Sequence, residues 1–346
     1  MAQTHIYVDP SIAADSGTGT IGDPFGDLEY AIVQTTYDTT NGTQVNIKAG
    51  TDEVLVAKIN VAMADTSVSV AWVPSQAAPL TFRGYTAVAD DGGIGSIDGN
   101  GAGAYTYTYH FVHWLDLEIF NCGTDPVVNN GQYGSFDKCH IHTTTGGGIR
   151  TAGDNAVTRC YIHAVGYIGI WNPTGYTGYN YLYDDGVEFT FSAIYMQSNI
   201  GHCERNIVQL SLAGNDQDGI AGSSRMQINN NAVWSNGGTG CGIKLLSVNN
   251  YPYCITNNLV EGFSGAGGIG INYSYSTNQQ AFRRGANAVY NCTTAYKALA
   301  NLVGVDYGDD ETLTASPFTD AANGDFSPVD TGNVKEGALP STLAGP

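Results

Sequence analysis

The sequence is poor in charged residues, and basic residues are the scarcest of them. Its 346 residues include 13 Lys and Arg against 32 Asp and Glu, which gives a net charge of -19 at pH 7. Such a chain repels phosphate backbones and anionic lipid surfaces, so we expect neither nucleic acid nor a membrane among its partners. No apolar run reaches the about 18 residues that a membrane-spanning helix needs.

Cysteine is present, but it lacks the spacing of a metal site or a disulfide framework. The seven cysteines are an odd number, and none forms a Cys-x-x-Cys pair. We expect reduced, packed thiols, with a bridge between Cys139 and Cys160 as the alternative. His140 and His142 are interpreted as two residues on one face of a strand. The first five residues have neither a basic start nor an apolar stretch, so we expect no signal peptide.

What the sequence does have is an internal repeat. An Asn or Cys (Leu in the first copy) precedes an aliphatic residue by two positions, and this motif recurs at intervals of 20 to 29 residues. The motif begins at Leu117, Cys139, Cys160, Asn180, Asn206, Asn231, Asn258 and Asn287. A second series, Gly followed by Ile or Val, runs in parallel from Gly148 to Ile271. Self-similarity of this period is typical of a solenoid, in which each repeat buries its apolar face against the next.

The motif alternates between faces, which predicts a strand in every repeat. Its first and third residues point inward, and its middle residue points outward. An inward Asn can hydrogen-bond to the backbone and to the Asn of the next coil, about 4.8 Å along the stack. We therefore expect the inward Asn residues from Asn206 to Asn287 to be stacked, and Cys139 and Cys160 to occupy the same column.

Repeats of this length and pattern resemble the pectin lyase-like superfamily of right-handed parallel β-helices. In the N-terminal third, residues 6–9 are a predicted strand, and Asp23-Pro24 is the predicted N-cap and first position of a capping helix over 25–37. The resemblance implies an all-β, single-stranded right-handed parallel β-helix, and the ladder spacing predicts about ten coils. The repeats leave no room for a linker. We expect one domain over 1–346, with the strand and capping helix in 1–42, the coils in 43–302 and a closing segment in 303–346.

Two rows of outward residues are candidate binding surfaces. One row follows the Gly-Ile pairs and consists of Arg150, Trp171, Glu188, Ala221, Lys244 and Asn272. The resemblance implies that this row forms a substrate groove, and we predict that Arg150, Trp171, Glu188 and Lys244 bind a glycan. The other row is Phe120, His142, His163, Tyr183, Gln209, Trp234, Glu261 and Tyr290. Its aromatic rings either stack on sugars or only cover the strands.

Catalytic motifs are present only in part. Asp184-Asp185, Gly201-His202 and Ile243-Lys244 resemble successive motifs of polygalacturonases, in which paired carboxylates protonate the leaving oxygen and activate water. The leading Asp of that family has no counterpart here, Cys203 replaces a Gly, and Gly242 replaces an Arg. If the protein is an enzyme, the catalytic candidates are Asp184, Asp185, His202 and Lys244.

The last four motifs also place small and aliphatic residues on the outer face. Ile207, Ala232, Leu259 and Ala288 form an apolar stripe that an isolated solenoid would expose. We expect another subunit or a long loop to cover it. We favour a subunit interface, with a homotrimer as the assembly.

Two classes of function follow from these patterns. The incomplete motifs favour a non-enzymatic structural or glycan-binding protein on the surface of a phage particle, similar to a decoration protein or a tailspike. Its partners would be other virion proteins or its own subunits, and a surface polysaccharide. The alternative is a secreted or virion-borne polysaccharide lyase or glycoside hydrolase that acts on an acidic polysaccharide. We expect no cofactor, although calcium stays open at the weak candidates Asp216 and Asp218, whose carboxylates are closely spaced.

Overall fold

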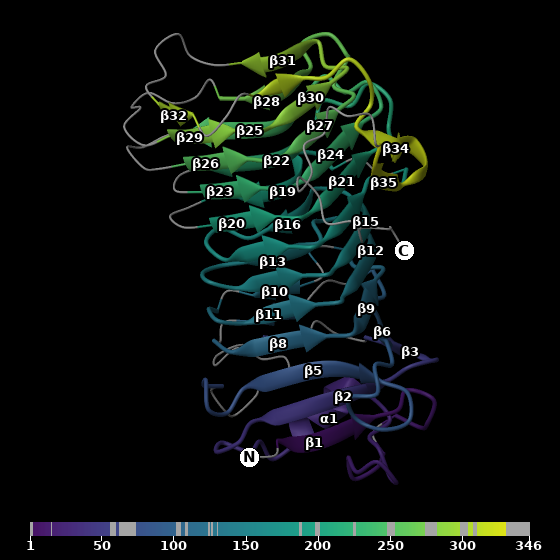
Figure 1. Ribbon diagram of the computed structural model, residues 1–346. Helices are drawn as coiled ribbons and strands as arrows, with labels where there is room; N and C mark the ends of the chain where they lie inside the picture. Colours follow the sequence, from purple (N-terminus) through teal and green to yellow (C-terminus); the bar gives the residue numbers. More distant parts are fainter. Residues whose placement is uncertain are drawn as a thin grey trace. The chain divides into compact units, whose positions relative to one another are not determined.

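The computed structural model describes residues 3–14, 16–55, 60–61, 74–101, 105–107, 110–123, 125, 127–129, 131–186, 189–197, 201–223, 226–247, 253–273, 282–297, 304–306 and 310–329. The chain divides into two compact units, Met1–Tyr161 (unit 1) and Ile162–Pro346 (unit 2). In both, successive coils contribute one strand to each of three parallel sheets, which we call sheets I, II and III in chain order (Figure 1). Among the described residues, no helix is long and apolar enough to cross a membrane.

Unit 1 contains the first strands of each sheet. Sheet I is formed by β1 (Thr4–Val8), β2 (Thr43–Lys48), β5 (Leu80–Tyr85), β8 (Val112–Leu115), β11 (Ser135–Asp137) and β14 (Ala156–Thr158). Sheet II is formed by β3 (Asp52–Val54), β6 (Gly95–Asp98), β9 (Leu117–Phe120) and β12 (His140–Thr144). Sheet III is formed by β4 (Asn60–Val61), β7 (Tyr105–Tyr107), β10 (Val127–Asn129) and β13 (Ile149–Thr151). The strand β15 (Tyr161–Val165) begins at the last residue of this unit.

Unit 2 repeats the pattern. Sheet I is formed by β17 (Tyr176–Gly178), β20 (Gly201–Glu204), β23 (Met226–Asn229), β26 (Tyr253–Thr256), β29 (Phe282–Gly285) and β32 (Gly304–Asp306). Sheet II is formed by β18 (Tyr181–Tyr183), β21 (Ile207–Leu210), β24 (Ala232–Ser235), β27 (Leu259–Glu261), β30 (Ala288–Tyr290) and β33 (Glu311–Thr312). Sheet III is formed by β16 (Ile168–Trp171), β19 (Ser192–Met196), β22 (Asp218–Ser223), β25 (Cys241–Ser247), β28 (Ile269–Asn272) and β31 (Thr294–Lys297).

The predicted Asn ladder is present in unit 2. Asn206 donates through Nδ2 to Oδ1 of Asn231 at 2.9 Å, and Asn231 donates in the same way to Asn258 at 2.9 Å. Asn180 precedes this series and Asn287 follows it, with equivalent bonds of 2.9 Å. All five side chains are at most 1% exposed. The inward alternation predicted from the motif is therefore confirmed.

The residue before each of these ladder residues has a left-handed backbone conformation, which the residue types at this position do not predict. The φ angle lies between 53° and 60° at Asp116, Lys138, Arg159, Tyr179, Arg205, Asn230, Asn257 and Ala286. None of these is Gly, although left-handed geometry favours Gly. In these eight coils a single left-handed residue makes the short turn from sheet I to sheet II. Where the ladder residue is Asn, its buried amide bonds the neighbouring backbone, as Asn231 does to the carbonyl of Cys203 at 3.0 Å.

The Gly-Ile series has a packing reason. A Cβ on Gly242 would lie 2.2 Å from Cγ1 of Val260 and 2.7 Å from the carbonyl oxygen of Gly270. Gly270 meets Val289 in the same way, at 2.5 Å. Glycine is required because the inward Val of sheet II fills the space under sheet III. The cysteines agree with the prediction of packed thiols, because Cys139 and Cys160 are buried and neither is in a disulfide.

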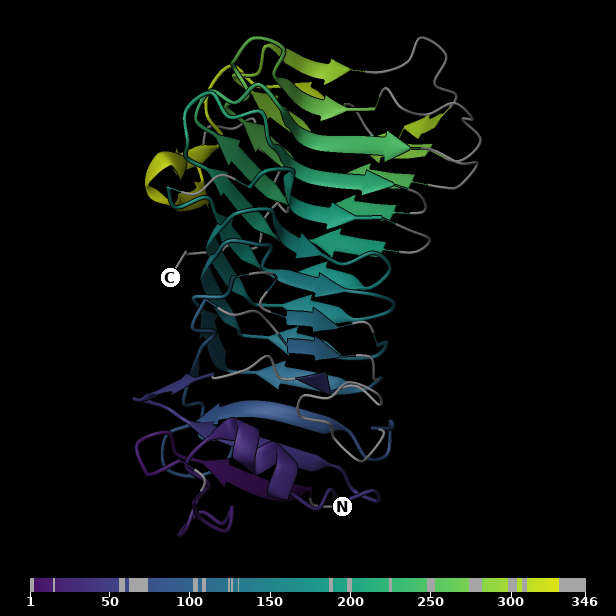
Figure 2. The ribbon, with the colours of Figure 1, turned by 180° about the vertical axis from the view of Figure 1, so that it is seen from behind.

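The capping helix is shorter than predicted and begins later. The helix α1 (Leu28–Gln34) has Asp27 as its N-cap, which accepts a hydrogen bond from the Tyr30 amide at 2.6 Å. The predicted N-cap, Asp23, instead pairs with Thr20 in an antiparallel bridge that closes a turn. The helix packs beside β1 (Figure 2) and buries Leu28 and Ile32.

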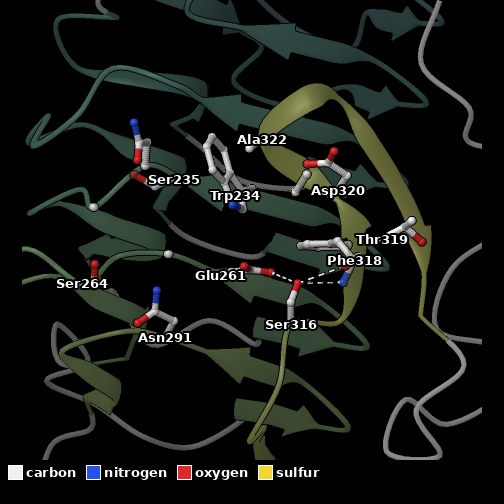
Figure 3. Close-up of a pocket in the computed structure, with 14 residues that line it drawn as sticks. Trp234, Ser235, Glu261, Ser264, Asn291, Ser316, Phe318, Thr319, Asp320 and Ala322 are labelled. Carbon is white, nitrogen blue, oxygen red and sulfur yellow. Dashed lines mark hydrogen bonds between the residues drawn. The ribbon is translucent and has the colours of Figure 1, made fainter.

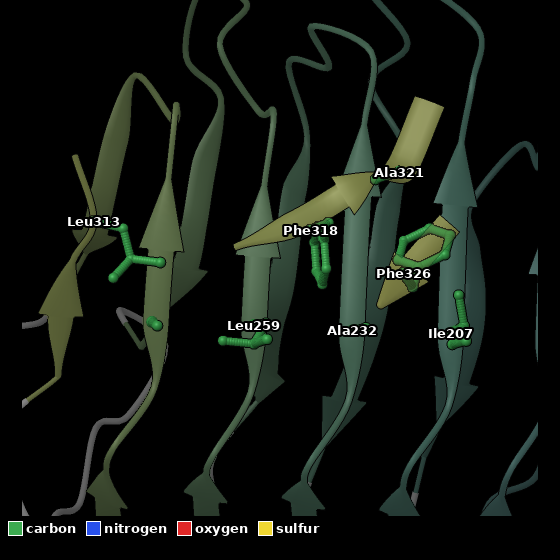
Figure 4. Packing of buried hydrophobic residues seen from close by; sticks show 8 residues of the cluster. Ile207, Ala232, Leu259, Leu313, Phe318, Ala321 and Phe326 are labelled. Atoms are coloured by element: carbon green, nitrogen blue, oxygen red, sulfur yellow. The ribbon is translucent and has the colours of Figure 1, made fainter. Parts of the chain in front are cut away.

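The C-terminal segment folds back onto sheet II of unit 2. The strands β34 (Phe318–Asp320) and β35 (Asp325–Pro328) are antiparallel, with the 3-10 helix η1 (Ala321–Asn323) between them. Phe318, Ala321 and Phe326 pack with Leu313 on the apolar stripe Ile207, Ala232, Leu259 and Ala288, where every member of the cluster is at most 8% exposed (Figure 4). The chain itself covers this stripe, in agreement with the alternative of a long loop, so the favoured expectation of a subunit interface at the stripe is wrong. The stripe thus gives no argument for a homotrimer.

Candidate functional site

The predicted groove row lies on sheet III, with one correction. In unit 2 the strand register places Trp171 beside Tyr195, Tyr195 beside Ala221, Ala221 beside Lys244, and Lys244 beside Asn272. The sequence analysis predicted Glu188 at the row position that Tyr195 occupies, because Gly186-Val187 matches the Gly-Ile series. The strand of that coil begins only at Ser192. Glu188 lies outside the described residues.

The aromatic members of this row form a small cluster. Trp171 meets Tyr195 edge-on with ring centroids 5.6 Å apart, and Phe191 meets the same Tyr195 at 5.1 Å. Phe191 keeps 37% of its surface exposed. Arg150, predicted as a further member, is in unit 1, where its guanidinium lies 3.7 Å from the Asp125 carboxylate.

Lys244 is held by a buried carboxylate. Its Nζ lies 2.8 Å from Oδ2 of Asp218, and the backbone amide of Cys241 donates to Oδ1 of the same residue at 3.0 Å. Burial raises the pKa of Asp218, and the ammonium of Lys244 opposes that shift. The Asp218 carboxylate is thus already neutralised, while Asp216 is exposed. This arrangement gives no support to calcium at these two residues.

The four conditional catalytic residues are not brought together. Asp184 is buried after β18, where it accepts hydrogen bonds from the backbone amide and the hydroxyl of Ser211, both at 2.6 Å. Its neighbour Asp185 is half exposed and lies 3.2 Å from Nδ1 of His163. His202 is on sheet I, and Lys244 is on sheet III. Asp184 therefore holds a turn, and the polygalacturonase-like arrangement is absent from these residues.

A pocket lies where the C-terminal segment meets sheet II of unit 2 (Figure 3). It has a volume of about 430 Å³. One wall carries Trp234 and Glu261, which the register places side by side on β24 and β27. The segment from Ser316 to Ala322 forms the opposite wall (Figure 3), and Asn236, Ser264 and Asn291 also line the pocket.

The carboxylate of Glu261 is fixed in this pocket. The Ser316 hydroxyl donates to its Oε2 at 2.6 Å and in turn accepts from the Phe318 amide at 3.2 Å. Burial raises the pKa of Glu261, and the hydrogen bond from Ser316 partly opposes this. Gln209, the neighbour of Trp234 in the same row, donates to the carbonyl of Ala322 at 3.1 Å. These bonds hold the two walls together.

The pocket combines a flat apolar ring with convergent polar groups. A volume of several hundred Å³ with such a lining is typical of small-molecule sites. Trp234 and Glu261 belong to the second outward row predicted from the sequence. Ser316 and Asp320 were not predicted, because nothing local shows where a C-terminal segment returns. The pairing of the apolar stripe with Phe318 and Phe326 is the signal that could have located them.

Comparisons with known proteins support the fold. No protein-family model and no curated protein sequence matches the chain. A solved structure of native GH136 lacto-N-biosidase from Eubacterium ramulus is similar, with a TM-score of 0.52 and 11% identity over 90% of this chain and 68% of that one. A rhamnogalacturonan lyase is similar with a TM-score of 0.51 and 15% identity over 90% of this chain and 83% of that one.

The chain therefore has a parallel β-helix fold, which it shares with these two structures. At these identities the similarity concerns the fold alone. One fold can carry many unrelated sites and activities, so the function of this chain depends on its own side chains.

Proposed function

We propose that the protein binds a glycan in the pocket between sheet II of unit 2 and the C-terminal segment. The observation that carries the proposal is the pair Trp234 and Glu261 on one wall of the pocket. An indole ring offers a flat face to the apolar side of a sugar ring. The Glu261 carboxylate and the amides of Asn236 and Asn291 can bond its hydroxyls. The names of the similar structures, a lacto-N-biosidase and a rhamnogalacturonan lyase, agree with a carbohydrate ligand.

This proposal keeps the non-enzymatic role expected from the sequence and moves the predicted binding surface. The Trp171 and Lys244 row on sheet III becomes the alternative surface in the same unit. The placement on a phage particle and the homotrimer stay predictions, with sedimentation of the purified chain as the measurement for the second.

Calorimetric titration against neutral and acidic oligosaccharides tests the proposal. Trp234→Ala should weaken binding at least about tenfold, because a buried aromatic contact is commonly worth more than about 1.4 kcal/mol. Trp171→Ala is the matched control, since it removes the same side chain from sheet III and should leave the affinity unchanged. The reverse pattern would place the glycan on sheet III. If no glycan in the panel binds, the proposal is refuted.

Glycoside hydrolysis is the second candidate, because Glu261 and Asp320 line the same pocket. The raised pKa of Glu261 suits a general acid that protonates the leaving oxygen. Asp320 is exposed and accepts a hydrogen bond from Asn323 at 2.8 Å, and it would activate water. If reducing sugar is released, Glu261→Gln and Asp320→Asn should each lower the rate by about a hundredfold or more. Lys244→Ala should leave the rate of hydrolysis unchanged. If a lyase acted on sheet III instead, the product would be an unsaturated uronate that absorbs in the ultraviolet, and Lys244→Ala would lower its rate of formation.

A further inference from the structure

Three potential metal ligands converge on the outer face of sheet II in unit 1. Glu118 lies on β9, and His140 and His142 lie on the neighbouring strand β12, with His140 directly beside Glu118 in the register. Oε1 of Glu118 is 3.0 Å from Nε2 of His142 and 3.3 Å from Nδ1 of His140. These ligand atoms all lie within 4.8 Å of one another. We propose that the three residues bind a divalent transition-metal ion of the Zn²⁺ type.

The distances suit such an ion. Imidazole nitrogens and carboxylate oxygens bind Zn²⁺ at about 2.0 to 2.2 Å, which places tetrahedral ligand atoms about 3.4 Å apart. The two contacts of Glu118 are close to that spacing, so small side-chain rotations would suffice. Two imidazoles with one carboxylate favour Zn²⁺, Co²⁺, Ni²⁺ or Cu²⁺ over Ca²⁺ and Mg²⁺, which prefer oxygen alone.

The histidine rings are held in place by their neighbours. His142 stacks on Phe120 with centroids 5.2 Å apart and planes at 3°, and His140 stacks on Tyr161 at 5.0 Å and 16°. Nδ1 of His142 lies 2.9 Å from Oγ1 of Thr143. When this nitrogen carries the proton and donates to Thr143, Nε2 presents its lone pair toward Glu118. Such an outer hydrogen bond orients a ligating histidine.

The site is accessible and would join two coils. The side chain of His142 is 19% exposed, and those of His140 and Glu118 are each 32% exposed, so an ion can enter and keep water on its open positions. The ion would link β9 to β12 and stabilise unit 1 against unfolding. The interpretation of His140 and His142 as only a strand-face pair would then be incomplete.

Calorimetric titration of the whole chain with Zn²⁺ tests the site, with Co²⁺ as a visible-absorption probe and Mg²⁺ as the hard-ion comparison. We expect one Zn²⁺ per chain, a rise in the unfolding temperature and no binding of Mg²⁺. His140→Ala and His142→Ala should weaken Zn²⁺ binding at least about tenfold and change the Co²⁺ absorption bands.

Two further variants control for misfolding and for binding by histidines outside the site. Glu118→Gln keeps the size of the side chain and a hydrogen-bonding oxygen, so the variant should fold normally. Its affinity for Zn²⁺ should nevertheless fall at least about tenfold, because the charged ligand is lost. His110→Gln removes an exposed histidine of the same unit and should bind like the unchanged chain. Equal Zn²⁺ affinity in the unchanged chain and the folded Glu118→Gln and His142→Ala variants would overturn the proposal, as would no binding at all.

Discussion

Asn231 shows what a single ladder residue contributes. Its Nδ2 donates to Cys203, Asn229 and Asn258, while its Oδ1 accepts from the backbone amide of Asn206 at 3.0 Å. Asn231→Ala leaves several buried groups without partners, and each such group costs about 1 to 3 kcal/mol. We expect the free energy of unfolding to fall by about 2 to 5 kcal/mol in urea denaturation. Gln227→Ala, on an exposed position of β23, should change it by less than about 0.5 kcal/mol. An equally small effect at Asn231 would contradict a stabilising ladder.

Glu53 is a second residue whose environment has a measurable consequence. Its side chain is 1% exposed and accepts a hydrogen bond from the Leu28 amide at the start of α1 at 3.0 Å. Burial raises the pKa of Glu53 from 4.5 to about 7, and the charges of Asp27 and Glu29 add to the shift. Between these two pKa values the folded chain binds a proton that the unfolded chain has lost. The contribution of Glu53 to stability therefore falls as pH rises from about 4.5 to about 7 and is constant above that range.

Glu53→Gln removes this titration and keeps an oxygen that can accept from Leu28. The unchanged chain should lose up to about 3 kcal/mol relative to the variant between pH 5 and pH 8. Unfolding midpoints at several pH values measure the difference. Glu29→Gln, a substitution in the same region, should largely keep the pH dependence. A constant difference between the unchanged chain and Glu53→Gln across this range would show that Glu53 does not titrate there.

At the scale of elements, local patterns predicted the repeating parts and failed where distant segments meet. The Asn ladder and the Gly-Ile series could be predicted because each repeat meets an almost identical neighbour. The row position predicted for Glu188 is occupied by Tyr195, and Gly186, which suggested a strand there, has a φ of 67° and lies in a turn. The pocket could be predicted only on the Trp234 and Glu261 side. Its other wall depends on Phe318 and Phe326 meeting a stripe more than 50 residues away in sequence at Leu259, a contact that no local periodicity encodes.

The C-terminal segment is an element whose docking can be tested directly. Phe326 is 2% exposed and meets Phe318 edge-on at 5.1 Å, over the stripe that includes Leu259. Phe326→Asp would bury an unpaired carboxylate there, which is strongly unfavourable. We expect the segment 316–329 to detach while the coils stay folded, so limited proteolysis should cut it early. Because one wall of the pocket is lost, glycan binding should be lost as well.

Ala315→Asp adds the same charge at an exposed position just before the segment and should leave both properties unchanged. Protection of the segment in Phe326→Asp would mean that other contacts, such as that between Gln209 and Ala322, are sufficient to hold it.

At the scale of the whole molecule, the net charge of -19 opposes folding through repulsion among carboxylates. Individual ion pairs offset this only locally, as between Arg83 and Asp116 at 2.9 Å. Sodium chloride shortens the range of charge interactions from about 10 Å at 0.1 M to about 3 Å at 1 M. Because repulsions outnumber attractions in so acidic a chain, the unfolding temperature should rise with added chloride salt. A charge-reduced variant, Asp154→Asn with Glu29→Gln, should show a smaller rise. A fall with salt would mean that ion pairs, rather than the net charge, dominate the electrostatic free energy.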